Sequence, residues 1–339
     1  MRIGVIGYGY WGPRIARNFH DLDGCELALI CDKRPDILRR AKQAYPDVPL
    51  TSDICEAITW PGIDAVAVVT PVWTHFELAK AALDNGKHVF VEKPFTSTVA
   101  EAEQLIDLAD RKHLQIMVDH TFLFTGAVRK IRQLIDDGTL GRLYYYDSTR
   151  VNLGLFQHDV NVIWDLAPHD LSIMDFLIKK KPVAVSAHGS VHFESKLEAI
   201  AYVSIEFEDN GFMAHFHVNW LSPVKIRRTL ISGDKKMLVW DDLSPDEKIK
   251  IYDRGVEFKS TNGTAKNGIH DLLVSYRTGD VYVPKIDNTE ALRAEIDYFV
   301  RCLEKNEEPF NNGQTGLQVV RLLEAADKSI KNNGRRIEL

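Results

Sequence analysis

RIGVIGYGYWGPRIARNF, residues 2–19, decides the fold of the first part of the chain. Ile3–Ile6 is a short apolar run typical of a buried strand, and Gly7, Gly9 and Gly12 follow it in the spacing GxGxxG. The rest of the stretch is compatible with a helix. Strand, glycine-rich turn and helix in this order predict a dinucleotide-binding site. Its glycines permit a tight turn and a close approach of the pyrophosphate, which the helix N-terminus stabilises.

The end of the next strand bears on the identity of the dinucleotide. Residues 26–31 (ELALIC) are typical of a buried strand, and Asp32 follows them, twenty residues beyond Gly12. A carboxylate at this place takes the ribose hydroxyls of NAD and repels a 2′-phosphate. Lys33 and Arg34 follow at once and could instead bind that phosphate. We expect NAD as the cofactor, with NADP as the less favoured alternative.

The following segments alternate between strand and helix, as in a parallel sheet. They are AVAVVTP (65–71), a helix at 75–86, HVFVEKPF (88–95), a helix at 98–112 and LQIMVDH (114–120). We expect His75 to cap its helix or to lie at the surface.

Ligands of doubly wound sheets bind beyond the carboxyl ends of the strands, so residues there are candidate contacts. His120 is a candidate substrate contact. The expected cofactor contacts are Gly7, Gly9, Tyr10, Trp11, Gly12, Asp32, Lys33, Thr70, Pro71, Glu92 and Lys93.

A second polar cluster begins the apolar segment WDLAPHDLSIMDFLI (164–178). Asp165 is a good helix N-cap, and it shares one face with His169 if the helix has already begun. A carboxylate one turn before an imidazole fixes its tautomer and stabilises its protonated form. Taken alone, the segment allows two interpretations: a catalytic pair, or a capping aspartate beside a core histidine.

The second half of the chain contains two candidate substrate-binding stretches. Residues 122–137 are typical of a helix, and the segments beyond residue 182 alternate like antiparallel strands. Alternate residues of a strand share a face, so a pair of cations two apart suits a diphosphate. An ordinary cluster of solvated charges is the other interpretation. The candidates are Arg150 and Asn152 in RVNLG (150–154), and Lys225, Arg227 and Arg228 in WLSPVKIRR (220–228).

Composition excludes several classes of protein. The chain has 339 residues, 45% of them apolar, and a net charge of −6, so we expect two globular domains and no nucleic-acid partner. We expect no membrane span and no signal peptide. The cysteines lack CxxC spacing, so we expect reduced thiols in a cytoplasmic protein and no metal site. The expected domains are 1–122 and 123–339.

Several motifs together resemble the Gfo/Idh/MocA oxidoreductases. They are GYGYWGP, VEKPF, the Asp-x-x-x-His pair and the C-terminal NGQTGLQVVRLLEAADKSI. The resemblance implies an α/β fold: an N-terminal Rossmann domain with a doubly wound parallel sheet, then an α+β domain with an open, mostly antiparallel sheet. It also implies that Lys93 is the active-site lysine and that His169 of the Asp165–His169 pair is the general acid/base. Arg14 departs from the Asn that relatives often carry.

The chemistry of the residues agrees with this resemblance. Oxidising a secondary alcohol needs a base for its proton, and histidine suits that transfer near neutral pH. Lys93 can donate to the same oxygen and stabilise the alkoxide-like transition state. The motifs look most similar to the nucleotide-sugar branch, which implies NAD-dependent oxidation of UDP-N-acetylglucosamine at C3. The alternatives are a UDP-sugar acid, a free aldose, inositol, reduction of a keto-sugar, or a non-catalytic NAD sensor. The family implies a homodimer or homotetramer.

Overall fold

The computed structural model describes residues 1–339 except 155–156, 193–195, 210 and 260–272. The chain divides into two compact units. Unit 1 comprises Met1–Thr125, Leu171–Asp175 and Asn288–Ala325, and unit 2 comprises Gly126–Asp170, Phe176–Asp287 and Ala326–Leu339. This division differs from the single boundary expected near residue 122, because two later segments belong to unit 1.

Unit 1 contains a six-stranded sheet in the order β3-β2-β1-β4-β5-β6. All of its strand pairs are parallel. The strand order reverses between β1 and β4, which is where dinucleotides bind in doubly wound sheets. The strands are β1 (Arg2–Ile6), β2 (Glu26–Cys31), β3 (Leu50–Thr51), β4 (Ala65–Val68), β5 (His88–Glu92) and β6 (Ile116–Asp119).

The helices of unit 1 include two that the sequence analysis did not predict, α2 and α3. The helix α5 begins where Thr98 and Glu101 form a capping box, which satisfies backbone N–H groups of the first turn. The elements are α1 (Gly12–His20), α2 (Pro35–Ala44), α3 (Ile54–Thr59), η1 (Val72–Thr74), α4 (His75–Asp84), α5 (Val99–Lys112), η2 (Thr121–Phe124), α8 (Ala291–Lys305) and most of α9 (Gly313–Lys331).

One predicted helix was wrong. The segment 122–137 is interrupted at Thr125, whose backbone is extended. The short helix η2 precedes that residue, and α6 (Gly126–Asp136) follows it in unit 2. Asp119 accepts hydrogen bonds from the backbone and hydroxyl groups of Thr121, which holds the start of η2 to the end of β6.

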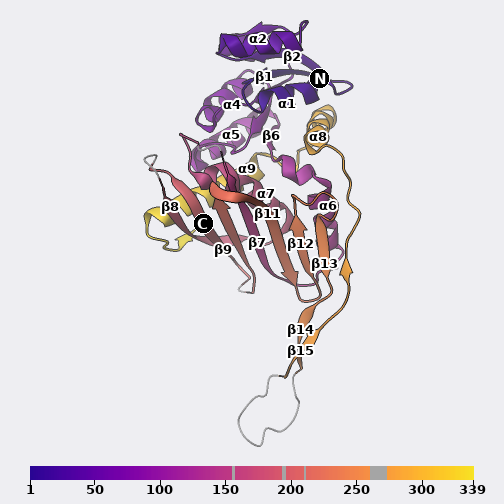
Figure 1. Ribbon diagram of the computed structural model, residues 1–339. Coiled ribbons are helices and arrows are strands. Elements are labelled where there is room, and N and C mark those ends of the chain that lie inside the picture. The colour runs from indigo at the N-terminus through magenta and orange to yellow at the C-terminus, as the bar shows by residue number, and fades with distance from the viewer. Residues whose placement is uncertain (155–156, 193–195, 210, 260–272) are drawn as a thin grey trace, which may run out of the picture. The chain divides into compact units, whose positions relative to one another are not determined.

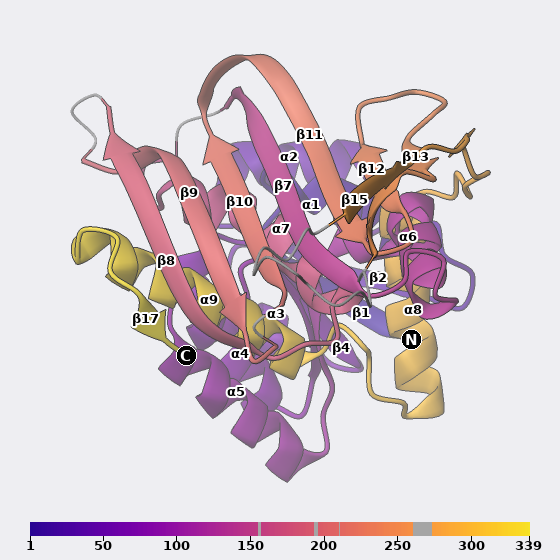
Figure 2. The same cartoon turned by 90° about the horizontal axis from the view of Figure 1, so that it is seen from below.

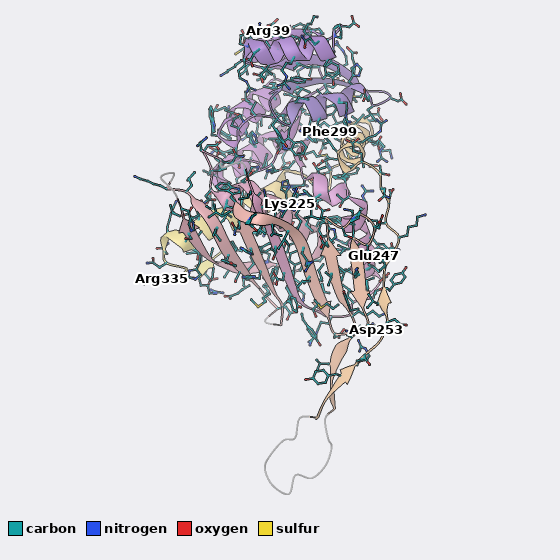
Figure 3. The ribbon with its side chains drawn as sticks, viewed as in Figure 1. Arg39, Lys225, Glu247, Asp253, Phe299 and Arg335 are labelled. Atoms are coloured by element: carbon teal, nitrogen blue, oxygen red, sulfur yellow. The ribbon has the colours of Figure 1, made fainter. Side chains whose placement is uncertain are left out.

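Aromatic packing explains why α8, which comes late in the chain, belongs to unit 1. The buried ring of Phe299 on α8 (Figure 3) lies 5.5 Å from Phe90 of β5 and 6.4 Å from Phe19 of α1, measured between ring centroids. Phe19 and Phe90 pack edge to face at 5.9 Å. Each aromatic ring buries a large apolar surface, so this cluster joins segments that are far apart in the chain.

Unit 2 is built on a nine-stranded sheet in the order β16-β13-β12-β11-β7-β10-β9-β8-β17. Among its described pairs only β7 and β10 are parallel. The strands are β7 (Leu143–Leu153), β8 (Pro182–Val191), β9 (Glu198–Phe207), β10 (Met213–Asn219), β11 (Leu221–Gly233), β12 (Met237–Asp241), β13 (Ile249–Tyr252), β16 (Val281–Tyr282) and β17 (Ile337–Glu338). The parallel sheet of unit 1 and this mostly antiparallel sheet confirm the predicted fold class.

Helices lie on one face of the second sheet. Figure 2 shows α6 and α7 (Val162–Leu177) behind it. The strands β14 (Gly255–Lys259) and β15 (Leu273–Arg277) form a separate ribbon that projects from one end of the sheet (Figure 1). Within the described part of the chain, no helix is both long enough and apolar enough to cross a membrane.

Candidate active site

The turn between β1 and α1 brings backbone atoms very close together. Gly7 has a φ of +97°, and a Cβ there would lie 2.2 Å from the carbonyl oxygen of Val69. A Cβ at Gly12 would lie 2.4 Å from the carbonyl oxygen of Gly7. Only glycine fits these two positions without a backbone shift. A Cβ at Gly9 would meet only the Arg34 side chain, at 3.4 Å, so this part of the turn is open to a ligand.

A cavity of about 650 Å³ lies beside this turn. The guanidinium of Arg14 lies over the rings of Tyr10 and Trp11, at 4.8 and 4.9 Å from their centroids. Three arginines in a cavity beside a helix N-terminus suit an anionic ligand. The residues present therefore fit the phosphates of a dinucleotide. The lining residues are Gly9, Tyr10, Pro13, Arg14, Arg34, Ile37 and Arg40.

Asp32 ends β2 as predicted, but its carboxylate is already engaged. Its Oδ1 accepts from the backbone N–H of Arg34 and from Arg34 Nε, each at 3.0 Å. Its Oδ2 accepts from Arg34 Nη2 and from the Tyr8 N–H, each at 2.9 Å. Burial favours a higher pKa for Asp32, but these hydrogen bonds outweigh it and leave the pKa below its ordinary value. Of the two basic residues that follow Asp32, Lys33 is exposed and Arg34 lines the cavity.

His75 corrects an expectation, because it is 1% exposed rather than at the surface. Its ring nitrogens lie 2.7 Å from the carbonyl oxygen of Thr70 and 2.9 Å from that of Pro94. These carbonyls belong to the loops that follow β4 and β5. The imidazole therefore links the segment Thr70-Pro71 to the segment that carries Lys93.

The carboxyl ends of β5 and β6 place the remaining predicted residues of unit 1. Glu92 is buried and pairs in register with Asp119, and Lys93 is half-buried. His120 is 1% exposed, and neither of its ring nitrogens has a hydrogen-bond partner among the described residues. Burial, and then the charge of Lys93, lower the pKa of His120 to about 3. A neutral buried imidazole whose ring nitrogens lack partners among the described residues suits a bound ligand. The substrate contact expected of His120 stays a prediction.

In unit 2 the DxxxH pair lies on the first turns of α7. Asn161, rather than Asp165, is the N-cap, because its Oδ1 accepts from the backbone N–H groups of Ile163 and Trp164 at 3.1 and 3.2 Å. The helix has therefore begun before Asp165, so Asp165 and His169 share a face, one turn apart.

Asp165 has a partner that the sequence did not indicate. Its Oδ2 accepts from Trp220 Nε1 at 2.9 Å. Trp220 is buried, and it lies between the strands β10 and β11. This hydrogen bond fixes the orientation of the carboxylate that we predict to act with His169. The sequence offered no signal for it, since the two residues are 55 positions apart.

The third polar residue of the segment, Asp170, forms a buried ion pair with Arg150. The Nε–Oδ2 distance is 2.6 Å and the Nη2–Oδ1 distance is 3.2 Å. Ser148 Oγ donates to the same carboxylate at 3.0 Å. A buried bidentate pair of this kind holds β7 to α7. Arg150 was expected to contact the substrate, but in the structure its guanidinium binds the Asp170 carboxylate.

Two of the three basic residues predicted on β11 have carboxylate partners. Arg227 Nη1 lies 3.4 Å from Asp242 Oδ2, and Arg228 Nη2 lies 3.2 Å from Asp241 Oδ2. Burial, and then the charge of Arg150, lower the pKa of Arg227.

Lys225 is the member of this cluster that remains accessible. It is exposed on β11, at the end of the sheet away from the β14–β15 ribbon (Figure 3), and no ion pair to it occurs among the described residues. Asn152 is half-buried on the neighbouring strand β7. The diphosphate contact expected of this cluster stays a prediction.

The comparisons with known proteins agree with this fold. The profile of the oxidoreductase family with an NAD-binding Rossmann fold matches residues 1–120, and that of the GFO/IDH/MocA C-terminal domain matches residues 128–239. The UDP-N-acetylglucosamine 3-dehydrogenase of Acidithiobacillus ferrooxidans is 28% identical, over 94% of each chain. A solved structure of that enzyme has a TM-score of 0.80 at 26% identity and covers 98% of each chain.

Two relatives from Bacillus subtilis differ in cofactor. The NAD-dependent scyllo-inositol 2-dehydrogenase is 25% identical over 91% of this chain and 88% of its own. The NADP-dependent scyllo-inositol 2-dehydrogenase is 24% identical over 98% of this chain and 94% of its own.

An NAD-binding Rossmann domain followed by this C-terminal domain defines an NAD(P)-dependent oxidoreductase. The chain belongs to the Gfo/Idh/MocA family, as the motifs predicted.

Proposed function

We propose that this enzyme oxidises a secondary hydroxyl of a sugar, and that its substrate is UDP-N-acetylglucosamine, oxidised at C3 with NAD as the preferred cofactor. The observation that carries the proposal is the Asp165–His169 pair on a formed helix, with Asp165 oriented by Trp220. A non-catalytic protein has no need of this arrangement. The A. ferrooxidans enzyme, named for this activity, supports the choice of substrate.

In this proposal three residues serve the oxidation of the hydroxyl. His169 removes the hydroxyl proton, and Asp165 holds the imidazole in the required orientation and stabilises its protonated form. Lys93 donates a hydrogen bond to the same oxygen as negative charge develops on it. The bound nicotinamide supplies the acceptor for the hydride.

The cofactor preference rests on the contact between Asp32 and Arg34. Asp32 favours NAD because its buried carboxylate is ionised and repels a 2′-phosphate. Arg34 neutralises that charge and lines the cavity together with Arg40, which supports some use of NADP. The two B. subtilis relatives are consistent with either outcome.

The nucleotide part of the proposal rests on Lys225. Arg227 and Arg228 have carboxylate partners, which leaves Lys225 as the exposed cation for a diphosphate. Oxidation of an inositol is therefore the second candidate, and the inositol dehydrogenases among the relatives favour it. A free polyol has no use for Lys225.

A turnover screen with NAD separates these candidates. It compares UDP-N-acetylglucosamine, a UDP-sugar acid, a free aldose and an inositol, each with and without added UDP. Substrate deuterated at C3 should transfer its label to NADH, and label from another carbon would refute the C3 assignment. Lys225→Ala should raise KM for the UDP-sugar with little change in kcat, because a diphosphate binds alike in ground and transition states.

Lys181→Ala is the matched control, since Lys181 is an exposed lysine of unit 2 that pairs with Glu208. Equal effects of the two lysine variants would remove Lys225 from the site. Faster turnover of a free sugar or inositol, without inhibition by UDP, would remove the nucleotide. Binding of NAD without turnover of any substrate would favour the non-catalytic alternative.

A further inference from the structure

The helix α7 contains a proline at a place where helices rarely accept one. Pro168 lies inside α7, which begins at Val162. Proline lacks the N–H that would donate to the carbonyl of Trp164, four residues earlier, and its ring crowds that carbonyl. In the first turn of a helix a proline is tolerated, because the N–H groups there have no intrahelical partner. The local sequence therefore favours a helix that begins just after Asp165, which is a good N-cap.

The structure has one turn more than this local preference. Asn161 is the N-cap, the helix begins at Val162, and the Asp165 N–H donates to the Asn161 carbonyl at 3.2 Å. Pro168 weakens the connection of this additional turn to the rest of α7, because it removes a backbone hydrogen bond between them. Contacts with other elements must therefore hold the turn in place.

Asp327 supplies such contacts. Its Oδ1 accepts from Asn161 Nδ2 at 3.0 Å, and its Oδ2 accepts from Trp164 Nε1 at 2.8 Å. Asn161 and Trp164 are each 8% exposed, so water competes little for either donor. Asp327 lies on the last part of α9, behind β8 in Figure 2, and this part belongs to unit 2 like the start of α7. One carboxylate thus binds the N-cap and the third residue of the helix.

The amide of Asn161 suits both of its functions. Its Oδ1 caps the helix, and its Nδ2 donates to Glu198 Oε2 at 3.0 Å as well as to Asp327. An aspartate at this position would cap equally well, but it would have no hydrogen to donate and would face two carboxylates. Asparagine therefore serves at once as the cap of α7 and as a donor to the carboxylates that hold it.

The additional turn decides what Asp165 binds. With the turn formed, Asp165 lies within the helix, where its Oδ2 accepts from Trp220 Nε1 at 2.9 Å and its side chain shares a face with His169. Without the turn, Asp165 becomes the N-cap. Its carboxylate then accepts the N–H of Ala167 in place of the Trp220 indole.

We propose that Asp327 is a positioning residue for the Asp165–His169 pair. It fixes the start of α7 one turn before Asp165, and so prevents Asp165 from becoming the N-cap. The proposal rests on the proposed catalytic roles of Asp165 and His169. Asp327 lies 166 positions beyond Asn161 in the chain, so the sequence gives no sign of this role.

The indole N–H signals of the six tryptophans report on this arrangement without any substrate. In a heteronuclear NMR spectrum, Trp220→Phe identifies the signal of Trp220. Asp327→Ala should move that signal, because Asp165 turns away from the indole. Ser329→Ala is the matched control, since Ser329 is buried on the same part of α9 and its hydroxyl donates to the Arg335 carbonyl at 2.6 Å. It should lower stability and leave the Trp220 signal in place.

Pro168→Ala provides the rescue experiment. Alanine restores the donor to the Trp164 carbonyl and removes the crowding, so the additional turn no longer needs Asp327. Asp327→Ala should therefore move the Trp220 signal in the parent and leave it in place in the Pro168→Ala background.

Activity should follow the same pattern once a substrate is known. In the parent, Asp327→Ala should lower kcat by at least about tenfold with little change in KM, because the catalytic pair is misplaced. The pH profile of kcat should change in the same direction as in Asp165→Asn. In the Pro168→Ala background the loss of kcat should be much smaller.

An unchanged Trp220 signal in folded Asp327→Ala would overturn the proposal. Equal displacement in both backgrounds, or in Ser329→Ala, would show a general loss of structure rather than control of the helix start. If Asp327→Ala fails to fold, Trp164→Phe replaces it in both backgrounds, because it removes one of the two donors to Asp327, and the Trp220 signal is read in the same way. A displaced and rescued Trp220 signal in a protein that turns over no sugar would support the control of the helix start and refute the proposed reaction.

Discussion

The guanidinium of Arg34 binds both carboxylate oxygens of Asp32, with Nε 3.0 Å from Oδ1 and Nη2 2.9 Å from Oδ2. Each carboxylate oxygen also accepts a hydrogen bond from a backbone N–H, Oδ1 from that of Arg34 and Oδ2 from that of Tyr8. Each oxygen therefore accepts two hydrogen bonds. A ribose hydroxyl that binds Asp32 must therefore displace Arg34, while a 2′-phosphate can bind the same guanidinium. The side chain of Arg34 is 56% exposed, so it is able to move.

The first prediction concerns Arg34 and cofactor choice. The parent should use NAD with a higher kcat/KM than NADP. Arg34→Ala should increase this preference by about tenfold, because it exposes the charge of Asp32 and removes the partner of the 2′-phosphate. The measurement is kcat/KM for both cofactors. Lys33→Ala is the control, and a larger effect of that variant would identify Lys33 as the phosphate contact instead.

The second prediction concerns the catalytic residues. Lys93→Ala and His169→Ala should each lower kcat by roughly 10²-fold or more, the scale of a lost acid/base or oxyanion donor. Asp165→Asn should also change the pH profile, because an amide no longer stabilises the protonated imidazole. Circular dichroism establishes that each variant is folded. Near-normal kcat in either alanine variant would exclude its proposed role.

The third prediction isolates the contact of Trp220 with Asp165. Trp220→Phe keeps an aromatic ring but removes the donor at 2.9 Å. A hydrogen bond to a charged group contributes about 1.5–3 kcal/mol, so kcat should fall by about tenfold while KM changes little. The pH profile is the decisive measurement, since a purely structural role for Trp220 would lower stability and leave that profile unchanged.

The fourth prediction separates a structural from a substrate-binding role of Arg150. Breaking its buried pair with Asp170 should lower the free energy of unfolding by about 3–5 kcal/mol in Arg150→Met, because Asp170 is left uncompensated. The double variant Arg150→Met, Asp170→Leu should recover most of that loss. Chemical denaturation measures both. A raised KM with unchanged stability would instead restore the substrate contact.

The fifth prediction is a dependence of stability on pH at Asp175 of α7. Burial raises the pKa of its carboxyl to about 6, from 3.8. The folded state favours the protonated form, so the stability from this group is complete below about pH 4 and is lost as the pH rises through about 6. A shift of about two units corresponds to about 3 kcal/mol. Asp175→Asn should therefore stabilise the protein near pH 8 and have little effect near pH 4.

Asp136→Asn is the control for Asp175. Asp136 is exposed, and its pKa is lowered, first by its hydrogen bond with Arg132. Asp136→Asn should change the free energy of unfolding little. The small change should be a loss of stability near pH 8 that disappears at low pH, opposite to the change expected at Asp175. If both variants respond alike, the effect is one of net charge rather than of burial.

The sequence by itself determined the features that arise from neighbouring residues. The glycine spacing predicted the turn after β1, and the structure shows the close backbone approach at Gly7 and Gly12 that requires it. The alternation of strand and helix predicted the parallel sheet. The spacing of Asp165 and His169 predicted their common face. Each of these follows from the local geometry of helices, strands and turns, which a short window of sequence contains.

Errors in the sequence-based predictions occur at the ends of helices. Asn161 caps α7 in place of Asp165, because both residue types are good N-caps and the start of the helix depends on contacts elsewhere. Asn161 Nδ2 donates to Glu198 and Asp327, each at 3.0 Å, and neither residue is near it in the chain. The break at Thr125 comes directly before Gly126, and a glycine inside a helical pattern is a recognised signal for such a break.

Only the tertiary structure decided which partner each polar residue takes. Arg150 was a candidate substrate contact and Asp170 had no assigned role, and the packing of α7 against β7 made them an ion pair. Asp327 carried no signal at all, and the fold of unit 2 brings its carboxylate to Asn161 and Trp164. The physical reason is that a residue type sets which bonds a side chain can make, while burial and strand order set which groups come within reach of it.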